Sequence, residues 1–382
     1  MRLKFIAAGA LAAACAFPAW ADKGPAVTDV LAHYGELVHA SYADSAAAAR
    51  RLQAAVDAFV AAPGEAGLDE ARKAWLAARE WYGQTEAFRF YGGPIDGKDG
   101  PEGRINGWPM DEAYVDSVQG HADAGIVNKR KIRLDARTLS GLNEKGGEEN
   151  IATGWHAIEF LLWGQDLSAD GPGKRVYTDF VDGSAPNADR RRQYLKVVTD
   201  LLVSDLAALE KAWAPQAKNY RAGFVKQPAS LAKVISALGI LSRAELAGER
   251  MEVALDSQSQ EDEHSCFSDN THRDIVANAT GIRNVWRGEF LRADGSRLAG
   301  PSLRDLVAAR DKAVADKVDA QMDVSVQAAQ AVPAPFDQAI LAGNPGRLKV
   351  EATVVALKAQ TESLVEAARV LGIKRLNTAL PE

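Results

Sequence analysis

The chain consists largely of long segments in which apolar residues recur every three to four positions, and this period restricts it to a helical fold. The segment 25–62 is rich in Ala, Leu and Val at this spacing and stops at Pro63-Gly64. Alternation with a period of two, which marks half-buried strands, is nearly absent. The sequence therefore predicts an all-α protein.

The same period predicts seven further helices. They are expected at 68–90, 148–164, 188–213, 228–257, 268–288, 303–330 and 346–372. Two connecting stretches, 91–147 and 164–187, are rich in Gly, Pro, Asn and Asp. A compact helical domain does not need an irregular segment as long as 91–147, and long loops of this kind are often functional.

The N-terminus has the pattern of an export signal. Arg2 and Lys4 precede an apolar run over 5–17, and Ala19-Trp20-Ala21 fits a small-x-small cleavage site. The run is too short to span a membrane, so residues 1–21 are predicted to be a signal peptide. We therefore expect the mature protein in the periplasm or associated with the outer membrane.

Composition limits which kinds of protein the mature chain can be. A lipoprotein acylated at Cys15 is disfavoured, because Ala12 stands where Leu is usual. Cleavage removes two positive charges and no negative one, so the formal net charge of −6 becomes −8. This charge argues against nucleic acid as a partner. Cys266 is then the one remaining cysteine, so a large core rather than an internal disulfide must stabilise the fold.

A chain of this length usually forms two domains. Pro215 and Pro228 flank a short polar stretch, and we place the boundary there. The expected units are a first helical bundle over 22–220, which includes the long irregular segment, and a second over 221–382. Asn150-Ile-Ala-Thr-Gly154 is echoed by Asn278-Ala-Thr-Gly281, a short match that suggests duplicated, bundle-like halves.

One helix carries an unusual polar pair. In GWHAIEFLLWGQD, residues 154–166, His156 and Glu159 are three positions apart and share a helix face. A glutamate among Phe160-Leu-Leu-Trp163 needs a partner if it is buried: a proton, an arginine or a metal ion. The spacing fits a local His–Glu pair as well as a pair of metal ligands.

Two other segments concentrate polar side chains. The helix end at Glu86 runs through Arg89 into a Gly-Gly-Pro turn ending at Asp96, where Glu86 and Arg89 form either a salt bridge or part of a site. The stretch QEDEHSCFSDNTHRD, residues 260–274, holds two histidines and five carboxylates. It is either a solvated loop with a helix cap or a source of ligands for iron, zinc, manganese or calcium.

These motifs resemble one family. Gly154-x-His156-x-x-Glu159 matches the signature of the imelysin family, also known as peptidase family M75, and Glu86–Asp96 and 261–272 are similar to two further stretches of it. The resemblance covers the mature chain and is strongest to the iron-regulated, insulin-cleaving-protease-like subgroup. It implies an exported, all-helical protein with a site where two bundle-like halves meet, and a link to bacterial iron uptake.

From this resemblance we expect a metal site between the halves. The candidate ligands are His156, Glu159, Glu86, Asp96, Asp262, His264 and His272. Arg89, Asp269 and Gly154 are expected to contact the ligand, with Arg89 orienting a carboxylate or an anionic group. Iron, free or in a small ligand, is the expected metal, although zinc suits the same donors. The expected partners are iron-uptake components of the periplasm or outer membrane.

The alternative is a metallopeptidase in which Glu159 is a ligand or the general base. A hydrolytic zinc site normally has three protein ligands and an open water position. The sequence lacks His-Glu-x-x-His, Gly-x-Ser-x-Gly and a P-loop, and its donors are spread over three segments. This distribution favours a binding protein. A purely structural role of the polar residues is the third reading.

Overall fold

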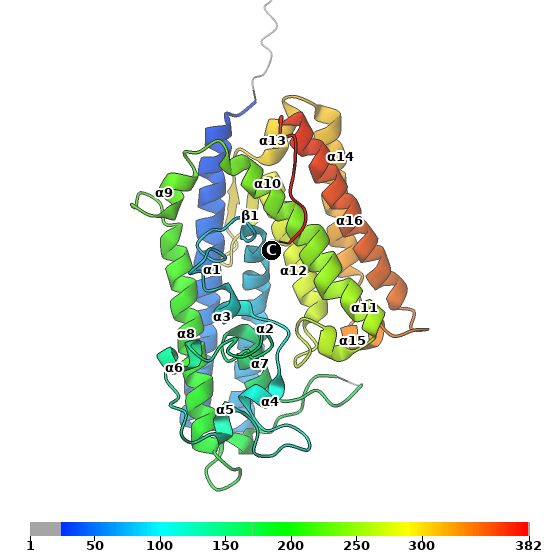
Figure 1. Cartoon of the computed structure of the whole chain (residues 1–382). Coiled ribbons are helices and arrows are strands. Elements are labelled where there is room, and N and C mark those ends of the chain that lie inside the picture. The colour runs from blue at the N-terminus through cyan, green and yellow to red at the C-terminus, as the bar shows by residue number, and fades with distance from the viewer. Residues whose placement is uncertain (1–23, 170, 381–382) are drawn as a thin grey trace, which may run out of the picture.

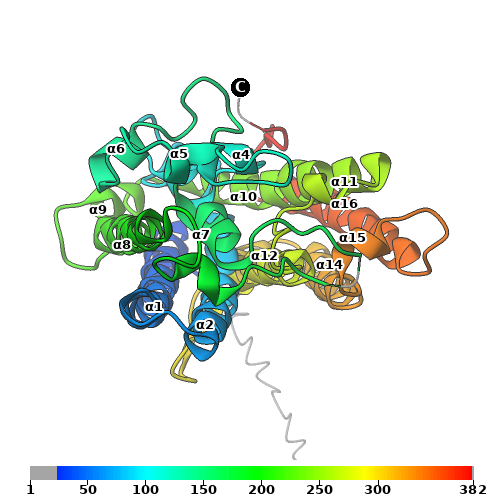
Figure 2. The same cartoon turned by 90° about the horizontal axis from the view of Figure 1, so that it is seen from below.

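The computed structural model describes residues 24–169 and 171–380, in which two groups of long helices lie side by side. Figure 1 shows the N-terminal group in blue to green and the C-terminal group in light green to red, and Figure 2 shows the same two groups along their axes. The predicted signal peptide and Cys15 lie outside the described residues. The prediction of an all-α fold is confirmed, since one two-stranded hairpin is the only sheet in the described chain.

The first group is built on three long helices, α1 (Val27–Ala61), α2 (Glu65–Thr85) and α8 (Ala188–Ala212), with α1 packed against both others. Shorter elements lie between and after them. They are η1 (Glu86–Phe88), α3 (Glu102–Asn106), α4 (Glu112–Val115), α5 (Gly125–Asn128), α6 (Ala136–Ser140), α7 (Gly154–Trp163), η2 (Tyr177–Phe180) and α9 (Tyr220–Phe224). The long segment 91–147 is thus irregular, as predicted, apart from four short helices.

The second group is a bundle of α12 (Thr271–Arg287), α14 (Lys312–Gln330), α16 (Arg347–Val370) and one continuous helical rod. The rod consists of α10 (Ser230–Ile240), η3 (Leu241–Glu252) and α11 (Val253–Ser257). The smaller elements are η4 (Gln260–Asp262), the antiparallel pair β1 (Glu289–Leu291) and β2 (Arg297–Ala299), α13 (Leu303–Ala308) and α15 (Phe336–Ala339).

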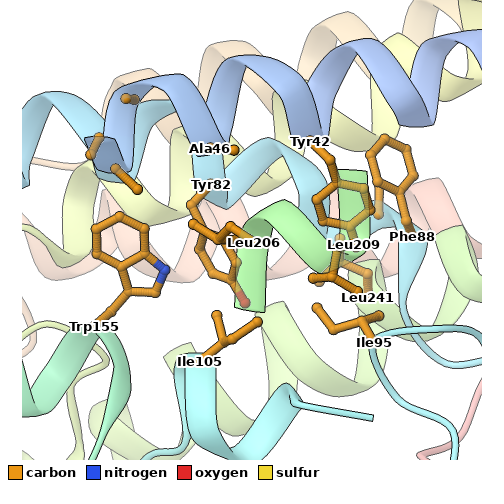
Figure 3. Packing of buried hydrophobic residues seen from close by; sticks show 14 of the residues in the cluster. Tyr42, Ala46, Tyr82, Phe88, Ile95, Ile105, Trp155, Leu206, Leu209 and Leu241 are labelled. Carbon is orange, nitrogen blue, oxygen red and sulfur yellow. The ribbon is translucent and has the colours of Figure 1, made fainter. Parts of the chain in front are cut away.

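The two groups share a hydrophobic core. Tyr42 of α1, Tyr82 of α2, Trp155 of α7 and Leu206 of α8 pack in one cluster with Leu241 of η3 (Figure 3). A smaller cluster is confined to the second group. Helix α12 packs against α2 as well as α14, so it belongs to both. The domain boundary between residues 220 and 221 stays a prediction.

Local chemistry explains where the helices differ from expectation. Helix α7 begins at Gly154, six residues later than predicted, because 148–153 forms a turn and an extended approach. The expected helix over 303–330 breaks after Ala308, and Asp311 starts α14 by accepting a hydrogen bond from the Val314 N–H. Segment η3 is wound as a π-helix, a rare form that periodicity does not reveal and that often accompanies functional sites.

Each helix of the described chain is too short or too polar to cross a lipid bilayer.

Candidate functional site

Helix α7 carries the His156/Glu159 pair into the centre of the molecule. All ten of its residues are buried. Gly154 opens it with φ = +87°, and a Cβ there would lie 2.4 Å from the Ile105 carbonyl oxygen. The hydroxyl of Thr153 donates to the Arg104 carbonyl oxygen across 3.0 Å. The structure thus gives Gly154 a packing role: only glycine lets α7 begin directly against α3.

Hydrogen bonds hold the side chains of His156 and Glu159 in place. His156 Nδ1 lies 2.9 Å from Glu159 Oε2, and Glu159 Oε1 accepts from the Ser268 N–H and hydroxyl at 2.9 and 2.6 Å. Burial raises the pKa of Glu159 to about 8, although the Ser268 hydrogen bonds and Arg79 oppose this shift. Burial and Arg79 hold the pKa of His156 well below its usual value. The pair is therefore uncharged overall at neutral pH.

A second histidine from the other side of the molecule meets the first. The ring centroids of His264 and His156 are 4.8 Å apart. His264 Nδ1 lies 2.9 Å from Asp274 Oδ2, and the Asn106 amide lies 3.4 Å from Nε2. Burial and then Arg250 lower the pKa of His264 to about 3. Both imidazoles are thus held neutral, which is the form that binds metals.

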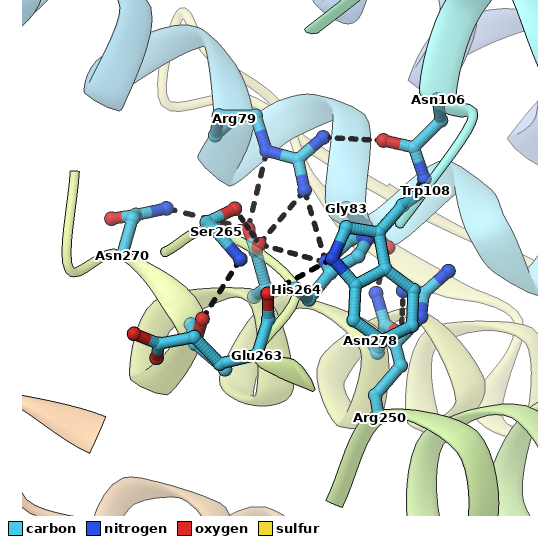
Figure 4. Close-up of polar contacts among 12 residues, drawn as sticks. Arg79, Gly83, Asn106, Trp108, Arg250, Glu263, His264, Ser265, Asn270 and Asn278 are labelled. Carbon is cyan, nitrogen blue, oxygen red and sulfur yellow. Dashed lines mark hydrogen bonds and ion pairs between the residues drawn. The ribbon is translucent and has the colours of Figure 1, made fainter. Parts of the chain in front are cut away.

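A buried ion-pair network surrounds the histidines, and Figure 4 shows the part of it around His264. Arg79 of α2 donates to Asp274 of α12 at 3.2 and 2.8 Å and to Asn106 Oδ1 at 2.7 Å. Asn106 in turn donates to Glu86 Oε1 at 2.8 Å, and Arg250 of η3 lies 2.6 Å from Glu86 Oε2. Five elements, α2, η1, α3, η3 and α12, therefore converge on one polar centre.

The carboxylates of this network stay ionised despite their burial. Desolvation alone would raise the pKa of Asp274, but Arg79 and the hydrogen bond from His264 outweigh it and hold that pKa well below the usual range. Burial likewise opposes ionisation of Glu86, and Arg250 and then Arg89 lower its pKa nonetheless. Each buried charge has a partner, which is the condition for keeping it in a core.

An open cavity of about 370 Å³ reaches this centre from solvent. It lies between α3, the 107–109 and 144–151 segments and η3, and His264, Asn106 and Arg250 form part of its wall. Five glutamates also line it: Glu102, Glu144, Glu148, Glu245 and Glu249. Arg89 lies in the same wall and pairs with Glu102 at 3.0 Å, Glu86 at 3.3 Å and Glu245 at 3.4 Å. Carboxylates outnumber basic groups, so the cavity favours cations.

The other predicted residues lie outside this centre. Asp96 accepts from the N–H groups of Tyr91 and Gly93 at 3.0 and 2.8 Å within the Gly-Gly-Pro turn. Asp262 is half-buried in the turn η4. His272 Nδ1 lies 3.0 Å from the Asp269 carbonyl oxygen in the first turn of α12. The structure therefore brings together His156, Glu159 and His264, with Glu86 linked through Asn106.

Sequence reasoning missed four members of the centre as site residues, namely Arg79, Asn106, Arg250 and Asp274. For the two arginines a signal existed. Arg79 follows Trp75 at i+4 on the apolar face of α2, and Arg250 follows Leu246 at i+4 on that of η3. A charge at a core position of a helix indicates a buried partner.

A separate group of donors lies close by. Glu263, Asp269 and Asp337 each offer a carboxylate oxygen, and these oxygens lie within 4.8 Å of one another. Within residues 24–169 and 171–380, this is the one group of three His, Cys, Asp or Glu side chains that meets this spacing. Asp337, far along the chain in α15, could not be connected to the 260–274 segment by sequence.

Comparison with known proteins gives consistent matches. The family model described as imelysin, peptidase M75, matches residues 38–364. Iron-regulated protein A of Synechococcus elongatus is 28% identical over 340 residues, which cover 86% of this chain and 82% of the relative. A crystal structure of an iron-regulated protein A precursor from Parabacteroides distasonis superposes with a TM-score of 0.72 at 20% identity, covering 91% of this chain and 96% of the other. An imelysin-like protein from Psychrobacter arcticum gives 0.65 at 15% identity, with coverages of 92% and 98%.

Proposed function

This chain belongs to the imelysin family, and from that membership and the acidic cavity we propose that it is an exported protein that binds iron, as the ion or in a small ligand, and serves bacterial iron uptake. The iron-regulated name belongs to its relative and supports an iron-related role here. The proposed location is the periplasm or the outer-membrane surface, and the proposed partners are iron-uptake components there.

The observation that carries this proposal is the cavity that connects solvent to His264, whose ring contacts that of His156. Its donors are carboxylate oxygens at the mouth and an imidazole in the wall, and behind them His156 Nε2 is buried without a hydrogen-bond partner. Two histidines with carboxylates are a donor set that suits iron. A free imidazole nitrogen in a core is otherwise an unfavourable arrangement.

Charge would guide the ion inward. Glu144, Glu148 and Glu249 are exposed at the mouth and raise the local cation concentration. Further in, burial opposes ionisation of Glu245, but Arg250 and Arg89 lower its pKa to about 2, so it is a carboxylate at neutral pH. Arg89 would release Glu102 or Glu245 to an incoming cation while its contact with Glu86 persists.

The peptidase alternative finds less support in this geometry. His156 and Glu159 are 1% and 0% exposed and hydrogen-bond each other. A hydrolytic metal needs three protein ligands and an open water position, whereas Glu159 already accepts two hydrogen bonds from Ser268. Binding is therefore the favoured function, and hydrolysis is kept as an outcome of the test.

The test is anaerobic equilibrium dialysis against Fe²⁺ with elemental analysis, using untagged protein of residues 22–382. The variant Glu144→Gln/Glu148→Gln/Glu249→Gln should bind iron about tenfold more weakly at low ionic strength. Its matched control, Glu65→Gln/Glu70→Gln/Glu362→Gln, removes three exposed charges elsewhere and should bind as the wild type does.

Two results would overturn the proposal. One is wild-type protein that holds no iron, and the other is equal iron affinity in both triple variants. Chelator-sensitive cleavage of an unfolded substrate, lost on Glu159→Gln, would establish the peptidase instead.

A further inference from the structure

We infer that Glu263, Asp269 and Asp337 form a second cation site, distinct from the cavity, that takes a hard divalent ion of the calcium class. Glu263 follows η4, Asp269 lies two residues before the start of α12, and Asp337 lies in α15. One carboxylate oxygen from each lies within 4.8 Å of the others. Calcium–oxygen distances of about 2.3–2.6 Å place ligands on opposite sides of an ion at about this separation.

The strongest indication is the state of the Glu263 side chain. It is 0% exposed, and neither of its carboxylate oxygens has a hydrogen-bond partner. No dashed line reaches this carboxylate in Figure 4, although the backbone oxygen of the same residue accepts from Trp108 Nε1 at 2.9 Å. Asp269 Oδ1 and Asp337 Oδ1 are also buried without partners.

Nothing basic compensates these groups within the part of the chain that the structure describes. The fully buried carboxylates of the polar centre all have partners: Asp274 pairs with Arg79 and Glu86 with Arg250, while Glu159 lies against His156 and accepts from Ser268. None of the ion pairs of residues 24–169 and 171–380 involves the three acidic groups. Three carboxylates this close are stable only with protons or with a cation between them.

Burial and the neighbouring carboxylates act in the same direction on two of these groups. Burial holds the pKa of Glu263 well above its usual value, and the charges of Asp337 and Asp269 add to this shift. The nearby Thr271 hydroxyl opposes the shift, although it makes no hydrogen bond to the carboxylate. Burial, then Asp166 and Asp337, raise the pKa of Asp269 to about 7.

The donor chemistry selects the ion. All three side chains offer oxygen, and Asp166, an acidic group whose charge acts on Asp269, has a buried Oδ2 without a partner. Sets of oxygen donors prefer calcium, magnesium or manganese, whereas zinc and copper favour nitrogen or sulfur. This separates the site from the cavity, where imidazoles contribute.

The site would position the loop that serves the histidine centre. Glu263 immediately precedes His264, and Asp269 immediately follows Ser268, whose N–H and hydroxyl hold Glu159. An ion bound to both ends of 263–269 and to α15 would fix this loop against the second bundle. We expect calcium to order the side chains that face His156 without binding them.

The test compares melting temperatures of chelator-treated protein at pH 8, with and without millimolar CaCl₂, together with calorimetric titration. The wild type should gain about 3 °C or more and bind one ion per chain. Glu263→Gln/Asp337→Asn should lose the calcium response, and its ion-free form should melt no lower than the ion-free wild type. Glu65→Gln/Glu70→Gln, with two exposed charges removed, should keep the full response.

A wild type that does not respond to Ca²⁺, Mg²⁺ or Mn²⁺ overturns the inference, as does a response that survives in Glu263→Gln/Asp337→Asn. If the double variant does not fold, Asp337→Asn alone carries the test, because it changes one atom in a four-residue helix. The triple variant of the cavity mouth should respond to calcium normally, which keeps this site independent of iron binding.

Discussion

His156 and His264 face each other in the core, with ring centroids 4.8 Å apart and ring planes at 64°. One ring comes from α7 in the first group of helices and the other from the loop before α12 in the second. Arginines lower the pKa of both, after burial. The contact therefore joins the two groups through a pair of neutral imidazoles, and its consequences can be measured.

The two histidines should act as one unit in iron binding. If both imidazoles serve the same ion, His156→Ala and His264→Ala each weaken Fe²⁺ binding, and the double variant is little worse than either single one. A double-mutant cycle of dissociation constants checks this. Fully additive losses would mean that the rings contribute separately and that one of them only packs.

Glu159 should make stability depend on pH with a definite sign. Its pKa is raised from 4.5 to about 8 by burial, so the folded state holds a proton that the unfolded state releases between these values. Below pH 4.5 the contribution of this group to the free energy of unfolding is at its full value. It falls by on the order of 4 kcal/mol as the pH rises from 4.5 to 8.

Glu159→Gln removes that dependence. The amide still accepts from Ser268 and can donate to His156 Nδ1, and the histidine contributions are common to both proteins. Urea unfolding of ion-free protein from pH 5 to 8 should show the variant gaining stability relative to the wild type as pH rises. Parallel curves would mean that Glu159 is ionised throughout.

Gly154→Ala should be strongly destabilising. The substitution combines φ = +87° with a Cβ placed 2.4 Å from a backbone oxygen of α3, so we expect a loss of about 3 kcal/mol or more. Gly120→Ala is the matched control, with φ = +82° and nothing within 4 Å of its Cβ, and should lose only about 1 kcal/mol. Equal losses in denaturant titrations would refute the packing role.

Asp116→Asn should also lower the free energy of unfolding strongly, although Asp116 lies away from the candidate site. The Asp116 carboxylate is 0% exposed and accepts from Arg191 at 2.6 and 3.1 Å and from Arg175 at 2.9 Å. Removing its charge leaves the buried Arg191 without an anion and Arg175 with only the more distant Asp179, at 3.8 Å, which costs about 3–5 kcal/mol. Asp182→Asn breaks an exposed pair with Arg192 and should cost no more than about 1 kcal/mol. Comparable unfolding energies for the two variants would contradict this ranking.

The helices were predictable because their stripes of apolar residues are local. The boundaries of α1, α8 and α16 lie within two residues of those expected, since a helix buries one face whatever it packs against. The break before Asp311 and the π-helical η3 were not foreseen. The apolar period continues through both, so it reveals neither the Asp311 cap that starts α14 nor the π-helical winding of η3.

The site was predictable only in part, for the same physical reason. His156 and Glu159 are neighbours on one helix face, so their contact follows from spacing. Arg79 and Asp274 are distant in sequence, and nothing local indicates that they meet. Asp96 lies apart from the centre, and its carboxylate accepts hydrogen bonds within the Gly-Gly-Pro turn.

The pairing of Arg79 with Asp274 also has a consequence for the order of events as the chain is made. The two residues are separated by 195 positions, so Arg79 leaves the ribosome long before its anion exists. Until α12 is synthesised, α2 carries a cation that its own core cannot accept. We therefore expect the native centre to form only after α12 has been synthesised.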